Sequence, residues 1–136
     1  MSGQPLSIFQ VAGRAMSAQL VRMNTTASNL ANVGNVASTE GAAYRTMKPV
    51  FRTSFDNASG LATVDVQQVV TAGEAPTKRY DPTNPMADGE GNVFEAAVDE
   101  TRELVDMMET ARTYQNNVEV MNTAKGLIVD TLKLGR

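Results

Sequence analysis

The feature that most constrains this chain is a long amphipathic helix predicted over residues 99–135. Asp99 is placed to cap its first turn, and Gly135 to end it in a left-handed conformation. Such a helix, about 50 Å long at 1.5 Å per residue, exceeds the width of a globule of this size, so it needs a partner along its length. Apolar side chains recur along one side of it in steps of three and four: Leu104, Met107, Ala111, Tyr114, Val118, Met121, Ala124, Ile128 and Leu132.

A second long helix is predicted over residues 7–33. Ser7 and Gln10 have the spacing of a capping box, Leu6 and Val11 have that of a hydrophobic staple, and Gly34 is placed to end the helix. Its apolar positions average 3.5 residues apart, which is the period of a coiled-coil seam; they are Phe9, Ala12, Met16, Leu20, Met23, Ala27 and Leu30. The two helices are expected to pair with each other or with copies of themselves.

The residues between the helices have a different pattern. Met47, Phe51 and Phe55 alternate with polar positions, a turn cluster follows at 56–60, and valines mark a second strand. We therefore predict a β-hairpin over 44–71, with Pro49 requiring an edge position. Residues 34–43 are interpreted as a linker and 72–92 as an irregular loop, followed by a short strand at Val93 and Phe94.

These elements predict a mainly α protein with a small β insert, an α+β fold. The long terminal helices form an antiparallel coiled-coil pair that flanks a small β-hairpin domain. The expected units are an N-terminal helix in 1–34, the linker, hairpin and loop in 35–97, and a C-terminal helix in 98–136.

Composition excludes most catalytic chemistry. The chain has no cysteine and no histidine, so thiolate nucleophiles, imidazole bases and disulfides are impossible. No nucleophile elbow or glycine-rich phosphate loop occurs, and we expect no enzyme, no catalytic residue and no cofactor. A net charge of −3 gives no reason to expect nucleic-acid binding. No apolar run is long enough to insert in a membrane, and the start lacks the pattern of a cleaved signal peptide.

Charge is unevenly distributed along the chain. Residues 1–55 carry five basic side chains against Glu40, whereas 88–109 carry eight acidic ones against Arg102. This separation suits stacked association, although a solvated helix start explains it equally well. The acidic residues also resemble a calcium loop around Gly89, but the EF-hand spacing is absent, so no metal site is expected.

The C-terminal helix has more apolar surface than one partner needs. Val105, Met108 and Val129 form a second row beside the first. An intramolecular pair of helices accounts for one row only, and the second row favours packing between molecules.

Three stretches resemble bacterial flagellar axial proteins. Residues 27–32 read Ala-Ser-Asn-Leu-Ala-Asn, similar to the signature near the N-terminus of that family. Residues 80–88 with Gly91 and Val93, and residues 117–125 with 131–135, resemble the central and C-terminal motifs of its FlgC branch of proximal-rod proteins. The resemblance spans the chain, but Asn84, Met86 and Asn92 depart from the residues common in the central motif.

The resemblance implies a structural subunit of the flagellar basal body. Copies would stack into the proximal rod, a helical drive shaft in the periplasm that transmits torque. Implied partners are other copies of the chain, the rod proteins FlgB, FlgF and FlgG, the rod-base adaptor and the flagellar type III export apparatus, which exports the family without cleaving a signal. The alternative from another class is a cytoplasmic helical adaptor or export chaperone that binds a partner helix.

The residues expected at assembly contacts are stripe and motif positions. They are Phe9, Met16, Met23, Asn29, Leu30, Asn32, Tyr80, Asp81, Pro82, Pro85, Leu104, Met108, Val118, Met121, Asn122, Ile128, Leu132 and Leu134. We expect Met121→Asp to block assembly without blocking export.

Overall fold

The computed structural model describes residues 7–135 as two long helices and five strands. In chain order the elements are α1 (Ile8–Ala31), β1 (Val36–Ala37), β2 (Met47–Asp56), β3 (Leu61–Thr71), β4 (Thr77–Tyr80), β5 (Asn92–Glu95) and α2 (Glu100–Leu134). This arrangement confirms the predicted α+β fold.

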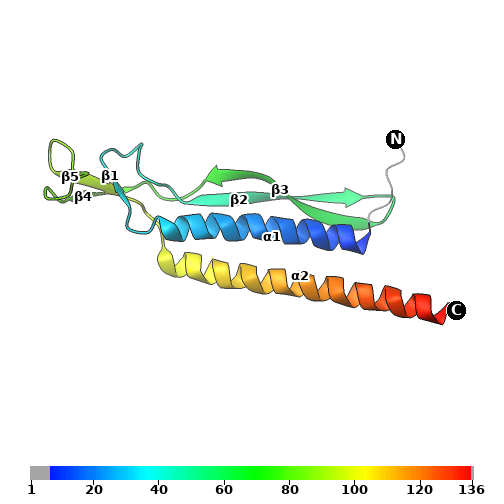
Figure 1. The fold of residues 1–136 in the computed structure, drawn as a ribbon. Helices are drawn as coiled ribbons and strands as arrows, with labels where there is room; N and C mark the ends of the chain where they lie inside the picture. Colours follow the sequence, from blue (N-terminus) through cyan, green and yellow to red (C-terminus); the bar gives the residue numbers. More distant parts are fainter. Residues whose placement is uncertain (1–6, 136) are drawn as a thin grey trace.

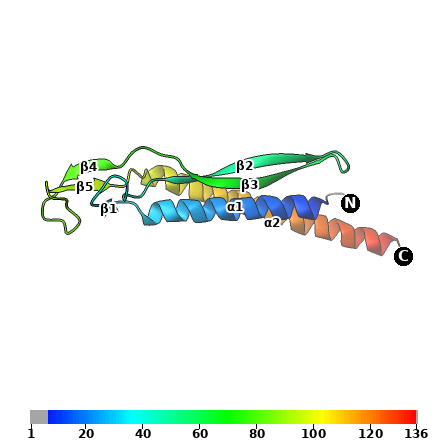
Figure 2. The same cartoon turned by 90° about the horizontal axis from the view of Figure 1, so that it is seen from above.

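Helix α1 is the middle layer of an elongated molecule (Figure 1). It contacts both strands of the β2–β3 hairpin on one side and α2 on the other. The two helices run antiparallel, and the small sheet of β1, β4 and β5 lies at the end of the molecule far from the C-terminus (Figure 2). No helix in residues 7–135 is long and apolar enough to cross a membrane.

Helix α1 begins at the predicted capping box. The backbone N–H of Gln10 donates to Ser7 Oγ at 3.3 Å, and the N–H of Ser7 donates to Gln10 Oε1 at 2.9 Å. The predicted staple cannot be assessed because Leu6 lies outside the described residues. The helix ends at Ala31, and Gly34 follows with φ +75°, a conformation that favours glycine.

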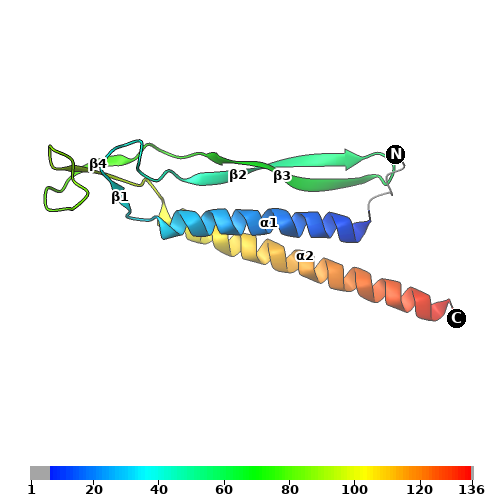
Figure 3. The same ribbon diagram turned by 45° about the horizontal axis from the view of Figure 1, so that its top comes forward.

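Helix α2 begins at the predicted cap, where Asp99 accepts a hydrogen bond from the N–H of Arg102 at 3.1 Å. The prediction for its other end is wrong, because Gly135 has φ −80° and is not left-handed. With 35 residues against 24 in α1, α2 is about 52 Å long against about 36 Å at 1.5 Å per residue. Its C-terminal turns therefore extend past the start of α1 (Figure 3).

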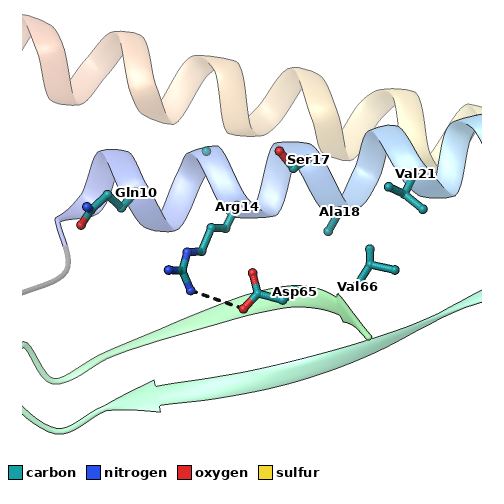
Figure 4. A pocket seen from close by; sticks show the side chains of 8 residues that line it. Gln10, Arg14, Ser17, Ala18, Val21, Asp65 and Val66 are labelled. Carbon is teal, nitrogen blue, oxygen red and sulfur yellow. Dashed lines mark hydrogen bonds and ion pairs between the residues drawn. The ribbon is translucent and has the colours of Figure 1, made fainter. Parts of the chain in front are cut away.

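The most deeply buried side chains of the two helices are small or polar, and Ala18 among them lies on the side of α1 that faces the hairpin (Figure 4). The buried residues are Ala12, Ala18, Thr25, Thr26 and Asn29 on α1, and Glu103, Thr110 and Ala124 on α2. Because α1 is covered on two sides, small residues there let both neighbours approach its backbone.

Several large apolar residues of the predicted stripes are not buried between α1 and α2. Leu20 is 44% exposed, Leu104 and Ile128 are each 47% exposed, and Leu132 is 69% exposed. The prediction that they close the seam between α1 and α2 within one chain is therefore wrong.

The predicted hairpin is confirmed. Strands β2 and β3 pair antiparallel from Met47 opposite Thr71 to Asp56 opposite Leu61, with one irregularity after Val50. Asp56 Oδ2 accepts hydrogen bonds from the Ser59 backbone and hydroxyl, which closes the turn. Pro49 lies in a two-stranded sheet, where each strand is an edge, so its missing N–H is tolerated.

The second sheet was only partly predicted. Strand β5 confirms the short strand at Val93 and Phe94, and Val93 is fully buried. Strand β1 lies in the segment interpreted as a linker, and β4 lies in the segment interpreted as an irregular loop. The order β1-β5-β4 brings the two long connections together at the tip of the molecule.

Candidate assembly surface

An apolar row on the first turns of α2 has no partner within the described chain. Leu104 is 47% exposed, Val105 57% and Met108 73%. At 100° per residue these side chains point away from the face that holds Glu103 and Thr110, which are buried against α1. We call Leu104, Val105 and Met108 the outward row. Large apolar side chains grouped on one exposed face are typical of a surface that binds another protein.

The C-terminal turns of α2 carry a second apolar surface. It begins where Leu127 shares a hollow with Ile8, the first residue of α1, and continues along the turns that extend past α1 (Figure 3). Its members are Leu127, Ile128, Val129, Leu132 and Leu134, with exposed fractions between 40% and 87%. We call these residues the α2 overhang. Val129 and the outward-row members Val105 and Met108 are the residues that the sequence assigned to a surplus row, and all three are exposed.

Asn29 links three parts of the molecule through one buried amide. Its Nδ2 donates to the carbonyl of Met47 at 2.9 Å and to Glu103 Oε2 at 3.0 Å. Its Oδ1 accepts from the Met47 N–H at 3.0 Å and from the Tyr44 hydroxyl at 2.6 Å. Both donors and both lone pairs of the side chain are thus used. We call Asn29, Tyr44 and Glu103 the polar node; it joins α1, α2 and the start of β2.

Two members of the polar node were not predicted. Glu103 is only 4% exposed, although the sequence assigned it to a solvated first turn. The signal was its spacing: Glu103, Met107, Thr110 and Tyr114 follow the same four- and three-residue steps as an apolar stripe. Burial, together with the negative charge of Glu103, raises the pKa of the Tyr44 hydroxyl above its ordinary value. The neutral hydroxyl is therefore favoured, as its role as a donor to Asn29 requires.

Part of the charge asymmetry in the sequence is satisfied within the chain. Arg22 of α1 lies 3.8 Å from Asp106 and 3.9 Å from Glu109 of α2, so basic and acidic segments meet across the helix interface. Arg14 pairs with Asp65 of β3 at 3.3 Å across a hollow between α1 and the hairpin (Figure 4). The separation of charge thus contributes to the fold and is only partly free to guide stacking.

The motif near residue 81 folds into an ordered turn at the tip. Asp81 accepts hydrogen bonds from the side chains of Thr83 and Asn84, and its N–H donates to Gly91 O at 2.9 Å. The hydroxyl of Ser38 reaches across from the β1 side to the carbonyl of Met86 at 2.9 Å. The motif therefore shapes the tip through internal contacts.

Asp88 occupies the position that resembled a calcium loop. Its Oδ1 accepts the N–H groups of Glu90 and Asn92, each at 2.9 Å. These backbone hydrogen bonds, chiefly that of Asn92, with the charge of Lys78, hold the pKa of Asp88 below its ordinary value. Across residues 7–135, no three acidic side chains converge in a way that would hold a metal ion.

The residues expected at assembly contacts fall into three classes of exposure. Asn29 is buried. The half-buried ones are Phe9, Met16, Met23, Leu30, Asn32, Asp81, Val118 and Met121. The exposed ones are Tyr80, Pro82, Pro85, Leu104, Met108, Asn122, Ile128, Leu132 and Leu134. The structure brings Leu104 and Met108 together in the outward row, and Ile128, Leu132 and Leu134 in the α2 overhang.

Both ends of the chain match flagellar families. Residues 9–42 match the family described as flagella basal body rod protein. Residues 90–134 match the family described as the C-terminal region of the flagellar basal body rod FlgEFG proteins. The first match covers nearly all of α1 together with β1, and the second covers β5 and the whole of α2.

Curated relatives extend this similarity over nearly the whole chain. The flagellar basal-body rod protein FlgC of Salmonella typhimurium is 44% identical over 133 residues, covering 96% of this chain and 98% of the relative. FlgC of Escherichia coli O6:H1 is 42% identical over 132 residues with the same coverage, and FlgC of Buchnera aphidicola from Acyrthosiphon pisum is 36% identical over 131 residues, covering 95% and 96%. The chain therefore belongs to the FlgC family of flagellar basal-body rod proteins.

Proposed function

We propose that this structural subunit of the flagellar basal-body rod assembles through the outward row and the α2 overhang. In this proposal α1 and α2 form coiled-coil contacts with the helices of neighbouring copies, and a helical drive shaft results that transmits torque. The observation that carries the proposal is the set of large apolar side chains left exposed on α2. Full burial of one such side chain stabilises an interface by about 1.5–3 kcal/mol, so several per contact are enough to hold a shaft under load.

The proposed partners are other copies of the chain and the rod proteins FlgB, FlgF and FlgG, with the rod-base adaptor at one end. The proposed route is export by the flagellar type III apparatus to the periplasmic rod, without cleavage of a signal. The absence of cysteine supports export of an unfolded chain, because no disulfide can form on the way. We propose that the chain has three functional segments, which are residues 1–34, 35–97 and 98–136. The two terminal segments form the assembly contacts, and the middle segment makes lateral contacts.

The test of the assembly surface uses a charge placed on the outward row. Met108→Asp puts a carboxylate where a 73% exposed methionine now lies, so the isolated fold should tolerate it while a neighbouring helix should not. We expect loss of swimming, with the variant absent from purified basal bodies but still detected outside the cytoplasm. Met108→Leu, which keeps an apolar side chain at the same position, is the matched control and should swim normally. Normal swimming by Met108→Asp would remove the outward row from the assembly.

The structure also shows why Met121→Asp is a less specific test. Met121 is half-buried and lies seven residues beyond Tyr114 and eleven beyond Thr110, on the side of α2 that faces α1. A carboxylate there is expected to disturb the pair of helices within one chain as well as contacts between chains.

A further inference from the structure

Within the part of α2 that α1 covers, the predicted apolar stripe and the observed buried face disagree at Leu104, near the start of the helix, whereas Met107 and Ala111 of the stripe are half-buried. In the first three turns Glu103 and Thr110 are buried, whereas Leu104, the residue after Glu103, is 47% exposed. Burial of apolar side chains alone would favour Leu104 in the buried position that Glu103 occupies. From Tyr114 to Ala124 the two agree, since Tyr114 and Met121 are half-buried and Ala124 is buried. A displacement confined to one end of a helix needs a local cause.

The polar node lies at that end. The carboxylate of Glu103 reaches Asn29 Nδ2 at 3.0 Å, and Asn29 is itself fixed by both backbone groups of Met47. Beside the node, Arg22 of α1 lies 3.8 Å from Asp106 and 3.9 Å from Glu109 of α2, and partly exposed ion pairs of this length contribute little to holding one rotation of α2. Thr110, which is fully buried, bonds its hydroxyl to its own helix at Asp106 O, and Gln19 Oε1 of α1 is buried without a hydrogen-bond partner.

We infer that the Asn29–Glu103 hydrogen bond sets the rotation of α2 about its axis and so keeps the outward row turned away from α1. Without this bond, apolar burial favours a roll that carries Leu104 towards α1 and Glu103 towards water. The roll is a fraction of the 100° between successive residues, and it hides part of the surface proposed for assembly. The polar node is thus a rotational latch, and its polarity keeps the contact surface available.

The test uses thiol labelling of the full chain, which has no native cysteine. Ala111 and Thr113 are both half-buried and lie on opposite edges of the buried face, so a roll covers one as it uncovers the other. Ala111→Cys and Thr113→Cys are introduced separately, each in the wild-type background, with Glu103→Ala, and with Asn29→Ala. Labelling rates are measured on dilute, monomeric protein beside its helical circular dichroism.

We expect either latch variant to raise the ratio of the labelling rate at Thr113→Cys to that at Ala111→Cys by about fivefold or more, because exposed thiols react faster. Glu103→Gln keeps an oxygen for Asn29 and should leave the ratio unchanged, as should Glu100→Ala, which removes an exposed charge from the same turn. An unchanged ratio in the helical latch variants would overturn the inference. Loss of helicity with both thiols fully reactive would also overturn it, because the bond would then hold the helices together without selecting a rotation. These readouts concern the isolated chain, so their failure would leave the role in the rod untouched.

Discussion

At the scale of single residues, Asn29 has a role that its motif alone does not disclose. The motif at residues 27–32 identifies the family, whereas the structure shows the Asn29 amide satisfying four hydrogen bonds to three other residues at 1% exposure. An amide in this setting cannot be replaced without leaving buried polar groups unpaired. The internal contacts of Asn29 therefore explain why a polar residue lies on the inner side of α1.

Truncation of Asn29 is the first prediction at this scale. Asn29→Ala leaves the Met47 backbone and the buried Glu103 carboxylate without their partner, which should lower the free energy of unfolding by roughly 2–4 kcal/mol. The measurement is the urea midpoint of the isolated chain. Asn24→Ala, at an exposed position of the same helix, is the control and should change stability by less than about 0.5 kcal/mol. Equal effects of the two substitutions would show that the node contributes nothing.

Tyr44 gives a prediction about pH. Its pKa is raised in the folded chain by burial and by Glu103, so the fold favours the neutral hydroxyl. The stabilisation is fully present below the pKa of about 10 of an unfolded tyrosine, and it is lost as pH rises through the higher folded pKa. As the pH is raised from roughly 9 to roughly 11, the urea midpoint of the wild-type chain should therefore decrease. The decrease should be smaller in Tyr44→Phe. Tyr80→Phe, at a 70% exposed position, should show the same change of urea midpoint with pH as the wild type. If Tyr44→Phe showed that same change, Tyr44 would not be the residue responsible.

At the scale of elements, the tip turn depends on one glycine. Gly91 has φ +80°, and a Cβ atom there would lie 2.9 Å from Tyr80 Cε2 and 3.1 Å from Pro82 Cβ. The site therefore excludes other residues both by backbone conformation and by space. Its carbonyl also receives the N–H of Asp81, so the turn and the start of the motif are coupled.

Gly91→Ala should consequently loosen the tip without unfolding the helices. We expect a local loss of roughly 1–3 kcal/mol, seen as faster amide hydrogen exchange in β4 and β5 while α1 keeps its protection. Gly89→Ala is a matched control two residues away, because the methyl group that alanine adds there would meet nothing within 4 Å and the φ of Gly89 is not positive. Similar exchange in the two variants would mean that the turn does not depend on Gly91.

The elements differ in how far the sequence could predict them. Both helices and the hairpin were predictable because caps, long periodic stripes and a turn cluster agree over many residues. Strands β1 and β4 were not, since two and four residues carry too little pattern and β4 has four exposed side chains. The rotation of α2 about its axis could not be predicted from the hydrophobic pattern either, because the burial of Glu103 depends on Asn29, 74 residues away.

At the scale of the whole molecule, unequal helix lengths make the isolated chain incomplete. Helix α1 covers the first part of α2 and one face of the hairpin, while the α2 overhang extends past it with its apolar residues exposed. Ile128 and Leu132 lie seven and eleven residues beyond Met121, so they continue the face of α2 that meets α1 further back. A neighbouring helix placed there would extend the same interface into the next subunit, which links the fold of one chain to the order of a shaft.

The overhang gives the last prediction. Leu132 is 69% exposed, so Leu132→Asp should change the free energy of unfolding of the isolated chain by less than about 0.5 kcal/mol. In the assembled rod the same carboxylate should meet an apolar partner without a compensating charge, and the variant should be missing from purified basal bodies. Leu132→Met, which keeps an apolar side chain at the same position, is the control and should assemble. Unfolding of the isolated Leu132→Asp chain would show that the overhang is part of the monomer's own core. Normal incorporation of that variant would instead show that the rod closes without this face.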